Sequence, residues 1–540
     1  MGKAQMSTAK PRIRVKAISS RAAHGLAPMQ ASYLRDTRSS IISTRPAILR
    51  DHRDDVRAVW QRTAGLAADI IQNSGRMRGA ADQVVADTVG VELSLNFKPK
   101  LDRLGYDAQE TVAFVREVKD WWKRLIWNPR ECDMRGKFTL PQMVDMALRS
   151  DMVFGEAVGV MTFMTRAQRR QYGITTGTKL CMMPAASLVQ DSNEFEGMFQ
   201  GVIHDANGRP VAYRFEEKQD GFKVKRDHRA YDADGRQIVV HVYDPIDPTD
   251  VRGISRIAPA IRKHIQHEVL VDATIQTQIL QTIVGMALTS AAPSAEAFEA
   301  IEALKETDGG LRDEFLAYYS GAMERARSGE ISISSDPRIS HLAPGEKLEF
   351  LSIGTPGPQF LPVSAELSRD MARAIGITYG GFTMDHTDAT YSSVNMENAS
   401  IWPTVTRRRE RIAAPICQAF FENSLDEAVG EGRIPFKGGY PAFAANREDV
   451  CWALWQGPAK PTADDGKCAK AQTERLINGT STLEAECGAL GHDPEEVFES
   501  RQYWHKRYVD AGMPSPFVAR NAGPQDAAEP DEPPKKKAAA

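Results

Sequence analysis

The chain has 540 residues, of which 42% are hydrophobic and 26% charged, and its formal net charge is −3. This length leaves room for several domains with large cores, and the near-neutral charge argues against a protein that grips nucleic acid through a positively charged surface. The longest apolar run, residues 283–288, is far shorter than the roughly 20 residues of a membrane span, so no membrane partner is expected.

The cysteines and the common catalytic motifs point to no enzyme class. The six cysteines are scattered without a CxxC pair, a pattern typical of a reduced, intracellular protein. The sequence also lacks a GxxxxGK[ST] phosphate loop, a GxGxxG motif and a GxSxG elbow. We therefore expect no cofactor and no ATPase, dehydrogenase or hydrolase chemistry.

The N-terminal residues 1–35 carry basic side chains and no apolar periodicity. The first 21 residues contain six lysines and arginines and no acid: Lys3, Lys10, Arg12, Arg14, Lys16 and Arg21. Chain ends without a buried face are usually poorly ordered. We expect a solvated, flexible arm here, with contact to DNA or to a scaffold as the alternative.

The next part of the chain favours helices. Apolar residues recur at helical spacing over residues 56–71 and 111–127, and residues 80–89 form a further helix candidate. The stretch VGVELSLNFKP between them alternates like a strand. Trp121, Trp122 and Trp127 are expected to lie in a core.

Residues 152–214 favour β-structure. MVFGEAVGVMTFM is an apolar run with two glycines, and Asn207-Gly208 suits the tight turn of a hairpin, which needs positive φ. Asp234-Gly235 predicts a second turn before RQIVVHVY.

A long helix is predicted over residues 259–284, with isoleucine and valine recurring on a stripe that drifts around the helix. A small α/β insert follows, and a second helix is predicted over residues 358–375. Within the long helix, His264, His267 and Glu268 form HxxHE, which matches no metalloprotease motif and is expected on the polar face.

Residues 376–411 hold the candidate functional side chains. Gly380 and Gly381 predict a hinge or sharp bend, Ser392 and Ser393 a helix N-cap, and Pro403 a kink. Apolar and acidic side chains fill the loop between them: Phe382, Met384, Asp385 and Asp388. The helix then closes on Arg407, Arg408, Arg409 and Arg411, expected at an interface between subunits, in a channel, or on a solvated face.

Several of these stretches resemble the portal proteins of lambda-like tailed bacteriophages. The motif of an Asp, two variable residues and Tyr-Ser-Ser appears as Asp388-Ala389-Thr390 followed by Tyr391, Ser392 and Ser393, the family's motif anchor. IGITYGGFTMD is similar to the family's lead-in, and GEA followed by GVIHDANGRPVAY is similar to a longer block. The resemblance spans about residues 40–510.

The resemblance implies an α+β portal fold with an α/β wing, long stem helices, a small α/β clip insert and a helical C-terminal region, assembled as a ring of twelve subunits. The implied layout is a basic arm (1–35), wing (36–251), first stem helix (252–289), clip (290–352), second stem helix (353–376), channel loop (377–395), kinked helix and wing completion (396–450), crown-like helices (451–515) and disordered tail (516–540).

By the same resemblance, the chain would form a ring at one capsid vertex, through which double-stranded DNA is packaged and ejected. Its partners would be itself, the terminase packaging motor, a head-tail adaptor, the major capsid protein and the scaffold. It would assemble in the host cytoplasm, end in the virion and catalyse no reaction.

Two metal sites remain as alternatives from the residues. Asp385, His386 and Asp388 supply oxygen and nitrogen ligands for a divalent cation, which would suit a metal-dependent nucleic-acid-processing enzyme. Zinc ligands could come from Cys451, Cys468, Cys487 and His492, although this set lacks the close ligand pairs of most zinc sites.

Overall fold

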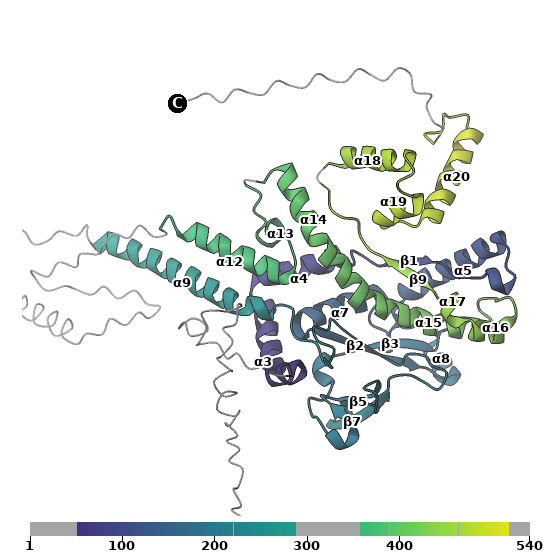
Figure 1. Ribbon diagram of the computed structural model, residues 1–540, viewed down its shortest axis with the longest axis horizontal. Helices are drawn as coiled ribbons and strands as arrows, with labels where there is room; N and C mark the ends of the chain where they lie inside the picture. The colour runs from purple at the N-terminus through teal and green to yellow at the C-terminus, as the bar shows by residue number, and fades with distance from the viewer. Residues whose placement is uncertain (1–50, 220, 288–356, 388, 463, 518–540) are drawn as a thin grey trace, which may run out of the picture. The chain divides into compact units, whose positions relative to one another are not determined.

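The structure is a computed structural model that describes residues 51–517 except 220, 288–356, 388 and 463 (Figure 1). The expected arm at 1–35, the clip at 290–352 and nearly all of the expected tail at 516–540 therefore lie outside the described residues. None of the helices that the structure describes is long and apolar enough to cross a lipid bilayer.

Of the N-terminal helices, α4 and α5 begin at side-chain caps. α3 (His52–Asn73) is followed by α4 (Gly75–Thr88), whose first turn is capped by Ser74. Strand β1 (Ser94–Phe97) leads to α5 (Ala108–Ile126), which starts with a capping box between Asp107 and Glu110. The short helix η1 (Asp102–Leu104) lies between β1 and α5, and α6 (Pro129–Cys132) follows α5.

The tryptophans of α5 do not all lie in the core as expected. Trp122 is buried and Trp121 packs partly against the core, but Trp127 is 45% exposed. Trp127 is the C-cap residue after the helix, and its Nε1 donates to Glu92 at 2.5 Å. α5 ends at Ile126, so the side chain of Trp127 does not continue the buried face of the helix.

The β-rich part forms two antiparallel sheets. One has the order β3-β2-β8, and Val158 of its central strand lies between Met183 and His241. The other has the order β4-β5-β6-β7. The strands are β2 (Glu156–Phe163), β3 (Thr178–Met183), β4 (Met198–Phe199), β5 (Val202–His204), β6 (Pro210–Gln219), β7 (Phe222–Arg229) and β8 (Val239–Tyr243). Between them lie α8 (Arg166–Tyr172), η2 (Ala185–Ser187) and η3 (Glu194–Glu196).

The apolar run expected to be strand from residue 152 instead begins in α7 (Leu140–Phe154). Gly155 ends this helix with φ of +81°, and β2 starts at the next residue. A short apolar run fits a buried helix as well as a strand, and the positive φ at the glycine decides where one changes into the other.

Two long helices lie side by side, α9 (Ala258–Ala287) and α12 (Phe360–Ile375) (Figure 1). The chain continues through α13 (Tyr379–Thr383), α14 (Tyr391–Arg408), a π-helical turn η5 (Arg409–Ala413) and α15 (Ala414–Gly430). The C-terminal elements are α16 (Gly439–Ala445), α17 (Arg447–Val450), β9 (Ala453–Gln456), α18 (Asp465–Ile477), α19 (Leu483–Ala489) and α20 (Pro494–Asp510).

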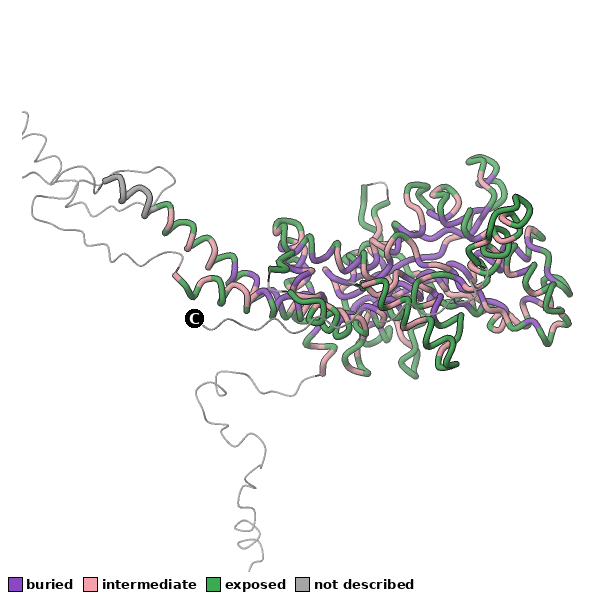
Figure 2. The backbone as a smooth tube through the Cα atoms, turned by 90° about the horizontal axis from the view of Figure 1, so that it is seen from above, coloured by how far each residue is buried: buried purple, intermediate pink, exposed green. Residues whose placement is uncertain are grey.

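The main core joins distant parts of the chain. β1 pairs antiparallel with β9, with Phe97 opposite Ala453. The Trp122 ring centroid lies 5.2 Å from that of Phe421 and 5.6 Å from that of Trp455. α15 lies inside this core, since twelve of its residues are buried. Figure 2 shows the buried residues in the interior of the body, with mostly exposed and intermediate residues around them.

A second core forms where α3, α4, α12 and α13 meet the start of α9. Its buried side chains are Ala67, Ile70, Met77, Ala80, Ala81, Val84, Met152, Ile257, Ala260, Ile261, Met371, Ala372, Ile375, Ile377 and Phe382. This core positions the candidate site, because α13 rests on it through Phe382.

A buried ion pair joins the β3-β2-β8 sheet to the start of α9. Glu156 and Arg252 are both almost fully buried, and the Arg252 Nε donates to both carboxylate oxygens at 2.8 Å. The His241 Nε2 lies 3.0 Å from the same carboxylate. Burial alone would raise the pKa of Glu156, but the charges and hydrogen bonds of Arg252 and His241 lower it to about 2.

Two glycines allow this junction to close. A Cβ on Gly253 would lie 1.9 Å from the Gly155 carbonyl oxygen, and a Cβ on Gly155 would lie 2.1 Å from the Ile254 backbone. No larger residue fits at either place without moving backbone. Gly155 of the GEA motif and Gly253, which follows Arg252, thus lie on the two sides of one contact.

Candidate functional site

The turn segment, residues 377–390, contains a short helix where the sequence predicted a hinge. Thr378 caps α13, its Oγ1 accepting from the Gly381 N–H at 3.0 Å. Gly380 and Gly381 therefore lie inside α13 and have no positive φ. A Cβ at position 380 would lie 2.7 Å from Cε1 of His386, so this exposed ring would have to move for a larger residue.

The two apolar side chains of this segment have different environments. Phe382 was expected at the tip of the loop but is 5% exposed and packs in the second core. Met384 is 74% exposed and has φ of +56°, a region that a residue with a side chain seldom adopts. Only Met384 therefore forms an apolar tip.

The acidic part of the segment is exposed. The Asp385 carboxylate accepts from the Thr387 N–H at 3.1 Å and from the Thr387 hydroxyl, and these hydrogen bonds lower the pKa of Asp385. Asp388 lies outside the described residues. Among the residues that are described, no group of three or more His, Cys, Asp or Glu side chains could hold a metal ion. The four zinc candidates, Cys451, Cys468, Cys487 and His492, are all described, and they form no such group.

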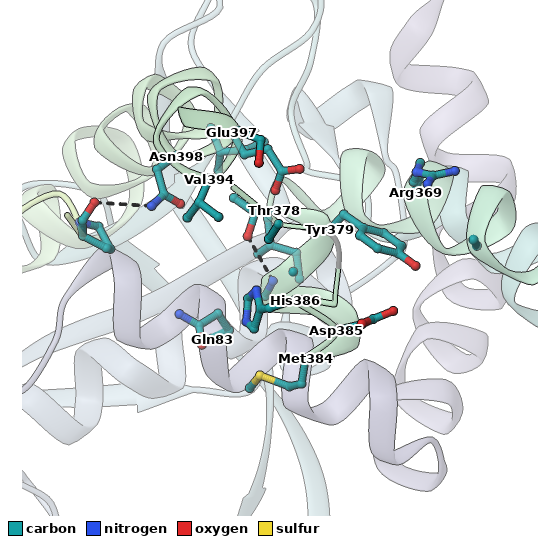
Figure 3. A pocket seen from close by; sticks show the side chains of 18 of the residues that line it. Gln83, Arg369, Thr378, Tyr379, Met384, Asp385, His386, Val394, Glu397 and Asn398 are labelled. Atoms are coloured by element: carbon teal, nitrogen blue, oxygen red, sulfur yellow. Dashed lines mark hydrogen bonds between the residues drawn. The ribbon is translucent and has the colours of Figure 1, made fainter. Parts of the chain in front are cut away.

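A cavity of about 750 Å³ lies beside the turn segment. Figure 3 shows polar side chains lining it from several elements, among them Gln83, Arg369, Thr378, His386 and Asn398. Asp87 of α4 also lines it, and burial raises the pKa of this carboxyl group although Gln83 donates a hydrogen bond to it.

The helix after the segment begins two or three residues earlier than expected. Its N-cap is Thr390 rather than Ser392 or Ser393: the Thr390 Oγ1 accepts from the Ser393 N–H at 3.3 Å, and the Ser393 hydroxyl accepts from the Thr390 N–H at 3.0 Å. The family's Tyr-Ser-Ser motif therefore forms the first turn of α14. Tyr391 is exposed, with the Lys467 Nζ 5.0 Å from its ring centroid. Pro403 lies inside α14, which continues to Arg408.

The arginine run, Arg407, Arg408, Arg409 and Arg411, lies in the last turn of α14 and in η5. Arg408 and Arg409 were expected at an interface, in the channel or on a solvated face, but both are buried. Arg408 donates to the carbonyl oxygen of Ile375, the last residue of α12, and Arg409 to that of Thr88, the last residue of α4. Cations at these positions satisfy the free carbonyls and complement the helix dipole.

The outer two arginines share one carboxylate that sequence reasoning missed. Asp244, just after β8, accepts from Arg407 at 3.0 Å, from Arg411 at 2.5 Å and from Arg256 at 2.9 Å. Burial would raise the pKa of Asp244, but the hydrogen bonds from Arg256 and Arg411 lower it to about 2. The arginine run thus ties η5 to β8, α4 and α12, and no local signal around residue 244 indicates this.

Replacing Asp244 by asparagine is expected to lower the free energy of unfolding by about 2 kcal/mol at pH 7, because hydrogen bonds to charged groups contribute roughly 1.5–3 kcal/mol. Since the folded pKa is depressed from 3.8 to about 2, this stabilisation is present above pH 3.8 and is lost as the pH falls towards 2. Denaturant unfolding at pH 7 and pH 3 measures both effects. Asp449→Asn, which removes an exposed pair with Lys100, is the control; a D244N variant with wild-type acid sensitivity would contradict the assignment.

The geometry and the sequence patterns can be compared with known proteins. The family model for phage portal proteins of the lambda family matches residues 39–409. The chain belongs to this family. The match covers α9, α12, the turn segment and all but one residue of the arginine run, so these elements are features of a portal-family chain.

Two curated portal proteins are similar to this member of the family over nearly their whole length. Portal protein B of Escherichia phage lambda is 22% identical over 473 residues, covering 84% of this chain and 85% of the relative. The portal protein of Escherichia phage N15 is 22% identical over 484 residues, covering 86% and 87%.

Among solved structures, a chain in the neck of an empty GTA particle, computed with C6 symmetry, is 13% identical with a TM-score of 0.39, covering 83% of this chain and 94% of that one. A chain in the neck of a native GTA particle, computed with C12 symmetry, is 14% identical with a TM-score of 0.31, covering 78% and 97%.

Proposed function

We propose that this chain is the subunit of a homo-oligomeric portal ring at one capsid vertex, through which double-stranded DNA is packaged and ejected. The observation that carries this proposal is the family match over residues 39–409. The two curated relatives are portal proteins, which favours a structural role over a metal-dependent nuclease built on Asp385, His386 and Asp388.

The exposed face of α9 supports self-association. Ile257 and Ile261 at its start are buried, but the stripe continues through Ile265, Val269, Ile275 and Ile279, which are 42–62% exposed. Contiguous exposed apolar surface marks interaction sites. A neighbouring subunit in a closed ring would cover this stripe, since head-to-tail contacts of identical subunits close into rings.

In this ring the turn segment would face the channel. Its exposed part carries Met384 and the Asp385 carboxylate, and a negative charge repels phosphate rather than holding it. Such a surface would let DNA slide. Terminase, a head-tail adaptor, the major capsid protein and the scaffold would be the other partners, with assembly in the host cytoplasm and a final place in the virion.

Ring formation is tested by electron microscopy and light scattering of the purified full-length chain. We expect closed rings for the wild type and smaller species for a Val269→Asp, Ile275→Asp double variant, which charges the exposed stripe without touching a buried side chain. Ile246→Asp is the matched control, because Ile246 is 73% exposed outside the stripe. A stable, folded wild-type monomer at micromolar concentration under several salt conditions would contradict the proposal.

A further inference from the structure

The two histidines of the HxxHE stretch of α9 are buried, contrary to their expected place on a polar helix face, whereas Glu268 is exposed. His264 is 2% exposed and His267 is 7% exposed. The Nε2 of His264 lies 3.0 Å from a Glu268 carboxylate oxygen, but neither ring nitrogen of His264 has a hydrogen-bond partner of good geometry. Burying two imidazoles in a helix pair costs free energy unless they make specific contacts, so their partners matter.

The charge of Arg76 beside His267 favours a neutral imidazole. Its Nε2 lies 3.3 Å from a terminal nitrogen of Arg76 and 2.9 Å from the Ser364 hydroxyl. A guanidinium can only donate, so a hydrogen bond from Arg76 uses the Nε2 lone pair, whereas the Ser364 hydroxyl can donate or accept. A proton on this nitrogen would instead place an N–H and a positive charge directly against Arg76.

Arg76 connects this histidine to the turn segment. Besides the contact with His267, its guanidinium donates to the Ser368 hydroxyl of α12 at 3.0 Å, and its Cζ lies 5.7 Å from the centroid of the Phe382 ring in α13. One arginine of α4 therefore touches α9, α12 and α13, and Phe382 is the side chain through which α13 rests on the second core.

We propose that His267 and Arg76 form a proton-sensitive junction that holds α9, α12 and α13 together while His267 is neutral and releases them when it is protonated. Protonation would repel Arg76 and thereby weaken its contacts with Ser368 and Phe382. The turn segment would then loosen together with the α9–α12 pair. This inference does not depend on the number of subunits in the assembly.

The polar and charged groups that face His267 favour its neutral form over its protonated form. α4 supplies Arg76, α9 supplies His264 and Glu268, and α12 supplies the Ser364 and Ser368 hydroxyls. Among the described residues no carboxylate forms an ion pair with His267; Asp370 of α12 pairs instead with Lys263 at the exposed edge. Burial, followed by the charges of Arg76 and His264, lowers the pKa of His267, and Glu268 opposes this only in part.

The His267–Arg76 junction is expected to weaken as the pH falls. Because the pKa is lower in the closed junction than in an opened one, the junction is fully stable above the ordinary histidine pKa of about 6.5 and weakens as the pH falls below it. For one histidine, the population of the opened junction rises by at most about tenfold between pH 7.5 and pH 5.5.

Hydrogen exchange of the full-length assembly at these two pH values, corrected for the intrinsic exchange rate, tests the proposal. In the wild type we expect peptides from residues 258–272, α12 and α13 to lose protection at pH 5.5 by up to about tenfold. His267→Gln, whose amide oxygen can still accept from Arg76, should remove this loss, and His505→Gln should retain it. Arg76→Gln should reduce it, because the charge that opposes protonation is gone.

An H267Q variant with the full wild-type pH response, or a wild type without any response in these peptides, would overturn the proposal. If H267Q does not fold, the R76Q variant decides: a response equal to that of the wild type would overturn the proposal, and a reduced one would support it.

Discussion

Replacing Glu156 by alanine is expected to lower the free energy of unfolding by roughly 3–5 kcal/mol, the typical result of removing one member of a buried ion pair. Arg252 would keep its charge in a site where its side chain has no exposed surface. Its remaining partners are the carbonyls of Gln200 and Ala185 and the Trp60 ring 4.7 Å from its Cζ. None of these compensates a positive charge fully.

The measurement is denaturant or thermal unfolding of the purified variant beside Glu484→Ala. Glu484 forms an exposed pair with Lys98, and removing such a pair costs at most about 1 kcal/mol. Because Arg252 lies in the segment that leads into α9, six residues before its start, E156A should also loosen the start of α9 before the main core unfolds. Equal stability of E156A and E484A would show that the buried Glu156–Arg252 ion pair is not a major source of stability.

The largest functional effect is expected from residues 384–387. Replacing Met384, Asp385, His386 and Thr387 by Gly-Gly-Ser-Gly keeps the chain length but removes the exposed apolar tip and its carboxylate. Phe382 and the Thr390 cap are untouched, so rings should form as in the wild type. If the segment contacts DNA in the channel, packaging or retention of DNA should fall to background in a complementation assay.

Replacing residues 206–209, the exposed turn between β5 and β6, by Gly-Ser-Gly-Gly keeps glycine at position 208, where φ is +79°, and is the matched control, which should package DNA normally. Normal packaging by the 384–387 variant would show that these residues are not the DNA-contacting element. Loss of the rings themselves would show that the segment holds subunits together instead.

Periodicity predicted the elements well because it depends on local spacing. The stripe around Val118 and Trp122 predicted α5, and the long stripe through Ile257 predicted α9 close to its bounds. Asn207-Gly208 gave the turn between β5 and β6, where Gly208 has φ of +79°. These features need only neighbouring residues.

The candidate site was predicted less well because its contacts are distant in the chain. Phe382 is buried because α4 and Arg76 cover it, and Arg409 is buried because it caps α4. Neither partner is adjacent in sequence, so a glycine pair followed by an apolar residue looked like a loop, and an arginine cluster looked like a surface. The Thr390–Ser393 spacing was a local signal for the true cap of α14.

The pairing of β1 with β9 has a consequence for how the protein is made. Phe97 and Trp122 leave the ribosome long before Phe421 and Trp455, the aromatic side chains that cover them. Until α15 and then β9 emerge, the first half of the main core is not fully covered, and its apolar surface is available for aggregation. A chain that stops before residue 453 should therefore be insoluble rather than partly folded, because the main core can close only after β9 has been made.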